Sequence, residues 1–360
     1  MTNRRTFLAG LLAASTTPKL TWADAGSPSY LAAAKLHDGT FSLFGLSNEG
    51  QDIFQIPLPA RGHAAAVHPI RPEAVAFARR PGRFALVINC ATGQLIQKLD
   101  APSERHFYGH GAFINNGEIL CTSENNIETG KGVVGLWARS ENYRRIGEFY
   151  SGGIGPHELK TMPDDQTIVI ANGGIRTHPD SGREKLNLET MCPNLSIINF
   201  NGSIIENLEL DKELRHNSIR HLDVSTDGKV AFGMQWEGDE TEIVPLLGVM
   251  NDSREIELLS APIEYQVALK SYIGSVAISA RNIGITAPRG GKVHIYSNFS
   301  KFQKSVSRSD ISGISANQTG FLTTDGNGRI SQLYRDVLKP IRATQRLWDN
   351  HLVKVNTKSP

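Results

Sequence analysis

Short apolar runs separated by polar turns dominate the chain after residue 25. Runs such as Thr167-Ile168-Val169-Ile170 are rich in valine and isoleucine, and they are bounded by turns such as Asn115-Asn116-Gly117 or Asp164-Asp165. Helical periodicity is weak throughout. This pattern is typical of β-strands joined by tight turns, so it predicts an all-β protein.

The strands recur in units that begin with a similar phrase. Gly62-His63-Ala64-Ala65, Gly109-His110-Gly111-Ala112 and Pro156-His157-Glu158-Leu159 place their histidines 47 residues apart. Each phrase is followed by further strand-like runs. Four strands in roughly 40–50 residues form the unit of a propeller blade.

Four more units follow these three. They begin at Arg220-His221-Leu222-Asp223, Gly274-Ser275-Val276-Ala277, Gly313-Ile314-Ser315-Ala316 and Asn350-His351-Leu352-Val353. The average step from His63 to His351 is 48 residues. The sequence therefore predicts seven blades.

The two ends of the repeat complete one another. Residues 30–36, 41–46 and 52–58 supply three strands, and residues 351–355 supply the missing first strand. A blade shared by both ends closes the ring and removes free sheet edges. We therefore expect residues 26–360 to form a single seven-bladed β-propeller whose first blade is closed by the C-terminal strand.

The first 25 residues are typical of a twin-arginine signal peptide. Arg4-Arg5-Thr6-Phe7-Leu8 precedes a short apolar run and the small-x-small site Ala23-Asp24-Ala25. This order predicts cleavage after Ala25 and export to the periplasm. The apolar run is too short for a membrane span.

Net charge and cysteine content limit the binding partners and the disulfides that this protein can have. Removing residues 1–25 takes Arg4, Arg5, Lys19 and Asp24 from the 38 basic and 36 acidic residues, which leaves a net charge of zero. A neutral protein without basic runs is a poor candidate for binding nucleic acid or anionic membranes. The three cysteines allow at most one internal disulfide, and burial as small apolar residues is the simpler interpretation of Cys90 and Cys121.

Five of the seven predicted first strands begin at a histidine. Because first strands line the channel of a propeller, we expect a ring of imidazoles at its mouth, formed by His63, His110, His157, His221 and His351. Imidazole is a common ligand of iron, copper and zinc, so the ring predicts a transition-metal site. Each histidine could alternatively be a packing or capping residue inherited by duplication. Glu158 and Asp349 are candidates for orienting the ligands.

A long polar insertion lies between two predicted strands of the fourth blade. Residues 173–194 have the length and polarity of a lid over the channel mouth. Arginines and a histidine in or near it are candidates for holding an anionic ligand. These candidate ligand-binding residues are Arg176, His178, Arg183 and Arg220. His37, His68 and His294 lie away from first-strand starts, and we expect ordinary structural roles for them.

Several phrases together resemble the bacterial family called domain of unknown function 1513. They are Arg105-His106-Phe107-Tyr108-Gly109-His110, Gly153-Ile154-Gly155-Pro156-His157-Glu158-Leu159, His178-Pro179-Asp180-Ser181-Gly182-Arg183, Ser218-Ile219-Arg220-His221-Leu222 and Trp348-Asp349-Asn350-His351-Leu352. The resemblance implies a twin-arginine-exported propeller, typically encoded near imelysin-like iron-uptake proteins, with a role in periplasmic iron or copper handling. A looser architectural likeness is to the propeller of nitrous oxide reductase, whose copper cluster is held by histidines.

These observations lead to three alternative hypotheses for the function. The leading hypothesis is a monomeric periplasmic propeller that binds a transition metal in iron or copper acquisition, with iron-uptake proteins as partners. The second is a hydrolase or lyase of the propeller type, in which a channel histidine such as His157 or His221 acts as general base. The third is a non-catalytic propeller that docks other proteins.

Overall fold

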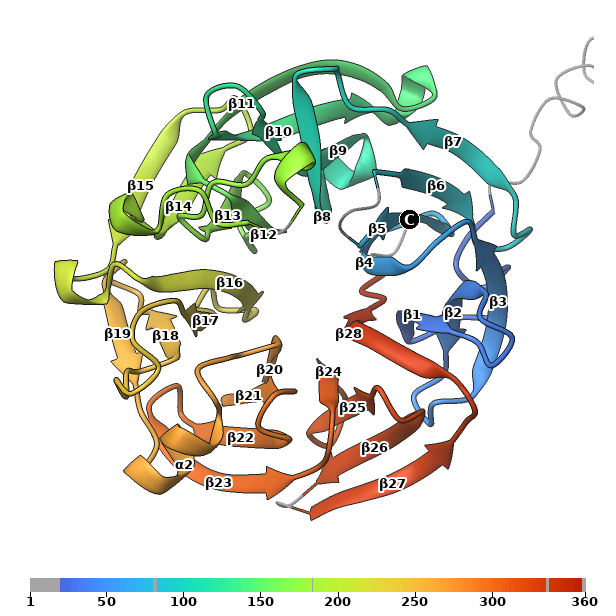
Figure 1. Ribbon diagram of the computed structural model, residues 1–360. Coiled ribbons are helices and arrows are strands. Elements are labelled where there is room, and N and C mark those ends of the chain that lie inside the picture. Colours follow the sequence, from blue (N-terminus) through green and yellow to red (C-terminus); the bar gives the residue numbers. More distant parts are fainter. Residues whose placement is uncertain (1–19, 80–82, 183, 335–336, 358–360) are drawn as a thin grey trace, which may run out of the picture.

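The computed structural model describes residues 20–79, 83–182, 184–334 and 337–357. Twenty-eight strands form seven antiparallel four-stranded sheets, and these sheets stand around a central channel as seven blades (Figure 1). The prediction of a seven-bladed β-propeller is confirmed. Most of the predicted signal peptide, residues 1–19, lies outside the described residues. No helix of the described chain is long and apolar enough to cross a membrane.

Each blade contributes its innermost strand to the channel. The innermost strands, from blade 1 to blade 7, are β28 (Leu347–Lys354), β4 (Gly62–Val67), β8 (Arg105–Ile114), β12 (Pro156–Thr161), β16 (Asn217–Val224), β20 (Ser275–Ser279) and β24 (Ile311–Ala316). The second strands are β1 (Tyr30–Lys35), β5 (Glu73–Ala78), β9 (Ile119–Asn126), β13 (Thr167–Asn172), β17 (Val230–Trp236), β21 (Asn282–Ala287) and β25 (Phe321–Asp325).

The third and fourth strands form the outer half of each blade. The third strands are β2 (Phe41–Leu46), β6 (Ala85–Asn89), β10 (Lys131–Ala138), β14 (Asn194–Asn199), β18 (Leu247–Met250), β22 (Lys292–Ser297) and β26 (Arg329–Tyr334). The outermost strands are β3 (Asp52–Leu58), β7 (Leu95–Leu99), β11 (Arg144–Ile154), β15 (Ile204–Glu209), β19 (Ile256–Leu259), β23 (Lys301–Ser307) and β27 (Val337–Ala343).

Burial explains why the strands differ in sequence. Every residue of β5 and β13 is buried, because both faces of a second strand pack against neighbouring blades. Such strands read as continuous apolar runs. The outermost strand β15 alternates between exposed and half-buried residues, since only one of its faces is covered. The hydrophobic core therefore lies between blades rather than at a single centre, as the packing of Val75 and Phe77 against Phe107 illustrates.

The C-terminal strand closes the ring. β28 pairs antiparallel with β1, so that Leu31 lies opposite Val353 and Ala34 lies opposite Trp348. The backbone N–H of Val355 also donates to the carbonyl of Ser29 at 2.9 Å. The prediction that both ends of the repeat share blade 1 is confirmed. The closed ring fixes the position of every innermost strand around the channel.

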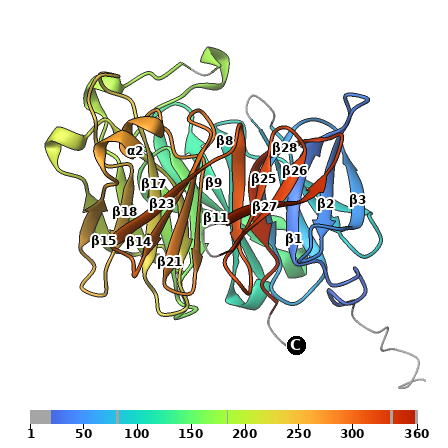
Figure 2. The same cartoon turned by 90° about the horizontal axis from the view of Figure 1, so that it is seen from below.

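The two faces of the propeller differ. The segment between β13 and β14, with short helices η3 (Pro179–Ser181) and η4 (Leu188–Thr190), rises on one face together with helix α2 (Ile263–Ala268), while the C-terminus leaves from the other face (Figure 2). The long insertion at residues 173–194 thus stands on the face where the innermost strands begin.

Candidate metal centre

A β-bulge marks each of the five innermost strands that carry the histidines. In β12, Pro156 pairs with Asn172 and Glu158 pairs with Ala171, so His157 is the extra residue. The register also shifts beside the other four histidines, by one residue in β4 and β16 and by two residues in β8 and β28. These shifts lie between Gly62 and Ala65, Ile219 and His221, Phe107 and Gly111, and in β28 opposite Ala32–Ala34. A bulge bends its strand and redirects a side chain. These bulges are the local features that place the histidines.

The structure differs from the sequence prediction in the depth of the site. His63 and His157 lie at the second position of β4 and β12, close to the predicted strand starts. His110, His221 and His351 instead lie four to five residues after the first residues of β8, β16 and β28. These three strands begin earlier than predicted, because residues between the blades already pair with the second strand. The histidines therefore lie inside the channel rather than at its mouth.

The five imidazoles meet around one axis. Ring centroids of neighbouring histidines are separated by 4.9 Å (His63 to His110), 4.9 Å (His110 to His157), 4.7 Å (His157 to His221), 4.9 Å (His221 to His351) and 4.6 Å (His351 to His63). The residues that the sequence singled out as metal ligands are thus brought together from five consecutive blades. Blades 6 and 7 contribute small or apolar side chains instead.

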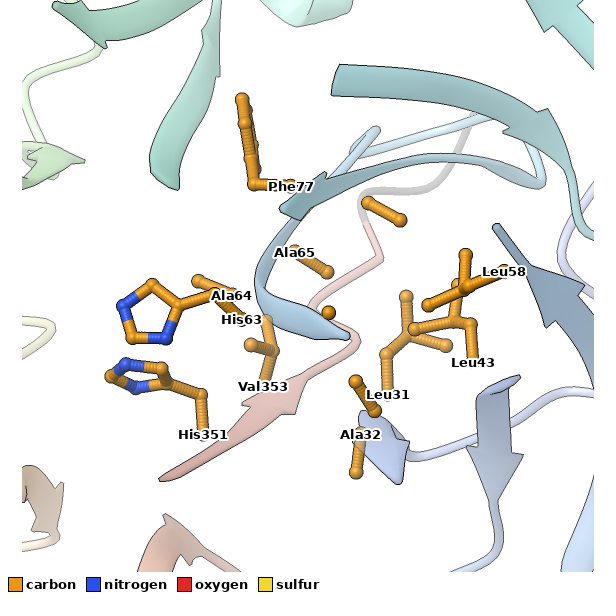
Figure 3. Close-up of a pocket in the computed structure, with 13 residues that line it drawn as sticks. Leu31, Ala32, Leu43, Leu58, His63, Ala64, Ala65, Phe77, His351 and Val353 are labelled. Atoms are coloured by element: carbon orange, nitrogen blue, oxygen red, sulfur yellow. The ribbon is translucent and has the colours of Figure 1, made fainter. Parts of the chain in front are cut away.

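Apolar side chains back the cluster on one side. Leu31, Leu43 and Leu58 lie behind His63 around a cavity of only about 10 Å³, and the rings of His63 and His351 point away from them (Figure 3). The rings of His63 and His351 consequently lie on the channel side of their strands (Figure 3).

Burial keeps these imidazoles neutral. Desolvation is the main cause that lowers the pKa of His63, His110, His157 and His351 well below the usual value. Neighbouring histidines and cations lower it further, and at His110 the carboxylate of Glu158 acts in the opposite direction. Burial and the nearby Arg220 and Lys160 lower the pKa of His221 to about 3. Neutral imidazole is the form that binds metals.

Three ring nitrogens in the cluster have no hydrogen-bond partner. They are Nδ1 of His63, Nδ1 of His157 and Nε2 of His351, and all three are buried. A buried polar atom without a partner is costly, so a ligand that contacts these nitrogens would stabilise the site. A transition metal would provide that ligand, so the residues fit a metal ion.

The ligand atoms form two overlapping sets. His63, His110 and His351 offer nitrogens within 4.8 Å of one another, and so do His110, His157 and His221. His110 belongs to both sets. Three protein ligands are enough to hold a transition metal with one coordination position open.

A carboxylate orients one of the histidines. The Oε2 atom of Glu158 lies 3.3 Å from Nδ1 of His221 and accepts the backbone N–H of Leu222 at 3.3 Å. Glu158 follows His157 in sequence, but its carboxylate contacts His221 of the next blade. A carboxylate at the second ring nitrogen fixes the tautomer and strengthens the other nitrogen as a ligand.

Asp349 has a different role from the one predicted. Its buried carboxylate accepts from Nε of Arg61 at 2.6 Å and from Nη1 of Arg79 at 2.7 Å, and it does not bond to His351. Arg61 and Arg79 follow β3 and β5, so Asp349 ties the closing strand to blades 1 and 2. The prediction that Asp349 orients a ligand is therefore wrong.

Three of the four candidate residues for an anion lie in the described part of the chain, and each has its own local surroundings. Arg176 donates from Nη2 to the carbonyl of Glu128 at 2.7 Å, and Nδ1 of His178 accepts from the backbone N–H of Asp180 at 3.2 Å. Arg183 lies outside the described residues. Arg220, next to His221 in sequence, is half-buried; its buried Nε has no partner, and its Nη2 lies 3.7 Å from Oε1 of Glu237.

The long insertion is bound to the blades on either side of its own. The carbonyl of Thr177 accepts from Nδ2 of Asn125 in blade 3 at 3.2 Å. On its other side, Lys185 forms an ion pair with Glu237, which follows β17 of blade 5. The insertion is thus held against the rim of blades 3 and 5.

A larger cavity occupies the other end of the channel. It has a volume of about 630 Å³. It is lined by His110, by His351 and by residues toward the ends of the innermost strands. Lys160 and Asp223 also line it, and their Nζ and Oδ1 atoms lie 2.6 Å apart. The sequence reasoning missed this pair. The alternation His221–Asp223 along one strand face is the signal that indicates its position.

The remaining histidines and the cysteines have structural surroundings. His68 accepts the backbone N–H groups of Ile70 and Arg71 at Nδ1, both at 3.0 Å, and His294 packs against Tyr265 and Phe302. Cys90 and Cys121 are buried and Cys192 is exposed; all three are free thiols. The apolar interpretation of Cys90 and Cys121 is confirmed.

The fold and the site together define a seven-bladed β-propeller with a histidine cluster inside its channel. The chain belongs to the family described as "Protein of unknown function (DUF1513)", whose model matches residues 56–355. Among solved structures, the chain is similar to Kuenenia stuttgartiensis hydrazine synthase, at 12% identity and a TM-score of 0.58 over 92% of this chain and 99% of that chain. This likeness shows the propeller fold. No curated protein matches the chain.

Proposed function

We propose that the protein binds a transition metal, iron, copper or zinc, at His63, His110, His157, His221 and His351. The single observation that carries this proposal is the convergence of five neutral imidazoles, buried or half-buried, three of which have a buried ring nitrogen without a partner. Converging neutral imidazoles suit these three metals. A metal ion coordinates the free nitrogens and offsets the cost of burying them.

We further propose that this binding serves iron or copper acquisition in the periplasm. The twin-arginine pattern of residues 1–25 supports export, and that route carries folded proteins. The encoded neighbours typical of the family support periplasmic iron-uptake proteins as partners. We propose that the protein acts as a monomer.

The acid–base alternative has less support. A general base works best when its pKa is near the working pH. Burial lowers the pKa of His221 to about 3 and that of His157 well below its usual value, so both are weak bases at neutral pH. Their surroundings favour metal binding.

Elemental analysis of protein purified from the periplasm tests the proposal. We expect about one or two equivalents of iron, copper or zinc per chain, and we expect the double variant His110→Ala/His157→Ala to lose them while its circular dichroism stays unchanged. His37→Ala, which removes an exposed histidine from a turn, is the matched control. A wild-type protein that carries no metal and takes up none of the three ions in equilibrium dialysis would refute the proposal.

A further inference from the structure

The two sides of the histidine cluster have different surroundings. His110 and His351 line the 630 Å³ cavity, and the other three histidines do not. Solvent reaches this cavity, because the side chains of Lys160 and Asp223 are 36% and 22% exposed. A small solute can therefore approach the cluster from this end of the channel.

The carboxylates next to the cavity already have partners. Asp223 accepts from Lys160 at Oδ1 and from the backbone N–H of Ile278 at Oδ2, 2.7 Å away. Glu158 is held by His221 and Leu222. Lys160 is different, because an ammonium has three N–H donors and Asp223 accepts one of them. Lys160 thus retains donors beside the cluster.

Lys160 is a permanent cation close to the histidines. Burial by itself would lower its pKa, but the carboxylates of Asp223 and Glu158 raise the pKa above its ordinary value. The positive charge of Lys160 also contributes to the lowered pKa of His110, His221 and His351. Its field therefore acts on the side of the cluster that faces the cavity.

The charge balance of a loaded centre requires an anion. Neutral imidazoles leave the full positive charge of a metal ion uncompensated, and buried charge without compensation is costly. Arg79 and Arg220 add positive charge that reaches His63 and His157, although Asp349 pairs with Arg79. Glu158 is the only carboxylate in contact with a ring of the cluster among the described residues.

We propose that the metal centre keeps an open coordination position toward the cavity and binds a small monoanion there, with Lys160 donating a hydrogen bond to that anion. This inference rests on the proposed metal site and names its ligand class. A three-histidine set leaves such a position open. The cavity is also lined by side chains that bear hydroxyl groups, such as Ser275 and Ser315, and these groups suit a small polar solute.

Azide titration of the copper(II)-loaded protein tests the inference. Azide bound to copper(II) produces a charge-transfer absorption band, and its growth gives a dissociation constant. We expect Lys160→Met to weaken azide binding about tenfold, the effect of one hydrogen bond to a charged group. Asp223→Asn should not weaken it, because it leaves the ammonium in place and removes a competing carboxylate.

Lys354→Met is the matched control, since Lys354 lines the same cavity at its exposed end. It should change azide affinity less than twofold. Copper content, measured on each sample, separates the two proposals. A protein that binds none of iron, copper and zinc refutes both. A copper-loaded protein that binds no azide, or that binds it equally well in wild type and Lys160→Met, refutes the anion site and leaves the metal site standing.

Discussion

Nε2 of His110 lies 3.2 Å from Nε2 of His63, so one of these nitrogens donates a proton to the other. Both nitrogens cannot be metal ligands in that tautomeric state, because the donor has no free lone pair. For both nitrogens to bind a metal ion, the proton would have to move to the other nitrogen of the donor ring. The pair couples the two innermost strands β4 and β8 before any ion is present.

His110 should matter more for metal affinity than any other single ligand. It belongs to both three-histidine sets, whereas His63 and His157 belong to one set each. We expect His110→Ala to weaken metal binding by roughly a hundredfold or more. For His63→Ala and His157→Ala, the expected loss of affinity is roughly ten times smaller than for His110→Ala. Competition titration with a chromophoric chelator measures these constants. Equal losses in all three variants would contradict the overlap of the two sets.

Glu158→Gln should weaken metal binding by about 10–100-fold without unfolding the protein. The carboxylate at His221 Nδ1 fixes the ring tautomer, and an amide does this less strongly. The same chelator competition gives the affinity, and Glu240→Gln, which changes an exposed carboxylate, serves as control. An unchanged affinity would show that the contact with Glu158 does not tune His221.

Asp349→Asn should lower the free energy of unfolding by about 2 kcal/mol. Asp349 is 3% exposed and accepts from both Arg61 and Arg79, so hydrogen bonds between charged groups are weakened. The ion pair of Asp52 with Arg346 also connects the segment before β28 to blade 1, but its carboxylate is 44% exposed, so Asp52→Asn should cost less than about 1 kcal/mol. Urea unfolding of both variants provides the comparison, and equal costs would contradict it.

His294→Phe should make the protein less sensitive to acid. Burial lowers the pKa of His294 to about 4, and its two ring nitrogens have no partner in the described structure. His294 of the unfolded chain binds a proton near pH 6.5, whereas His294 of the folded chain binds one only near pH 4. The contribution of His294 to the free energy of unfolding is therefore fully present above pH 6.5 and is lost as pH falls toward 4.

The loss amounts to at most about 3 kcal/mol. Denaturant unfolding at pH 7 and pH 4.5 measures it in wild type and in the variant, which places a phenyl ring among Tyr265, Tyr296 and Phe302. The variant should lose less stability between these pH values than wild type. An identical loss would show that His294 does not cause the acid sensitivity.

Trp22 should stabilise blade 1. Its indole is 4% exposed, packs among residues of blades 1 and 2, and donates from Nε1 to the carbonyl of His68 at 2.9 Å. Cleavage after Ala25 would remove it. We expect a chain beginning at Gly26 to be less stable than one beginning at Leu20 by about 3 kcal/mol. Thermal unfolding compares the two chains, and mass spectrometry of the exported protein gives the natural start.

Sequence periodicity was sufficient for the fold because a propeller is built from local units. Each blade is a run of consecutive antiparallel strands, so alternation, turn residues and the 47-residue spacing of His63, His110 and His157 predict both the strands and their number. The missing first strand of blade 1 indicated the closing role of β28 for the same reason. The five histidines were identified from their repeated position alone.

Tertiary structure decided where those histidines point and what surrounds them. Bulges at His157 and Arg220 depend on pairing between strands, and nothing in the local sequence fixes the residue at which the register shifts. Three contacts join residues of different blades: Glu158 contacts His221, Asp349 forms ion pairs with two arginines, and Lys160 forms an ion pair with Asp223. The contacts of Asp349 depend on closure of the ring, and the other two depend on the packing of blade 4 against blade 5. Side chains more than sixty residues apart become neighbours only through such packing between blades.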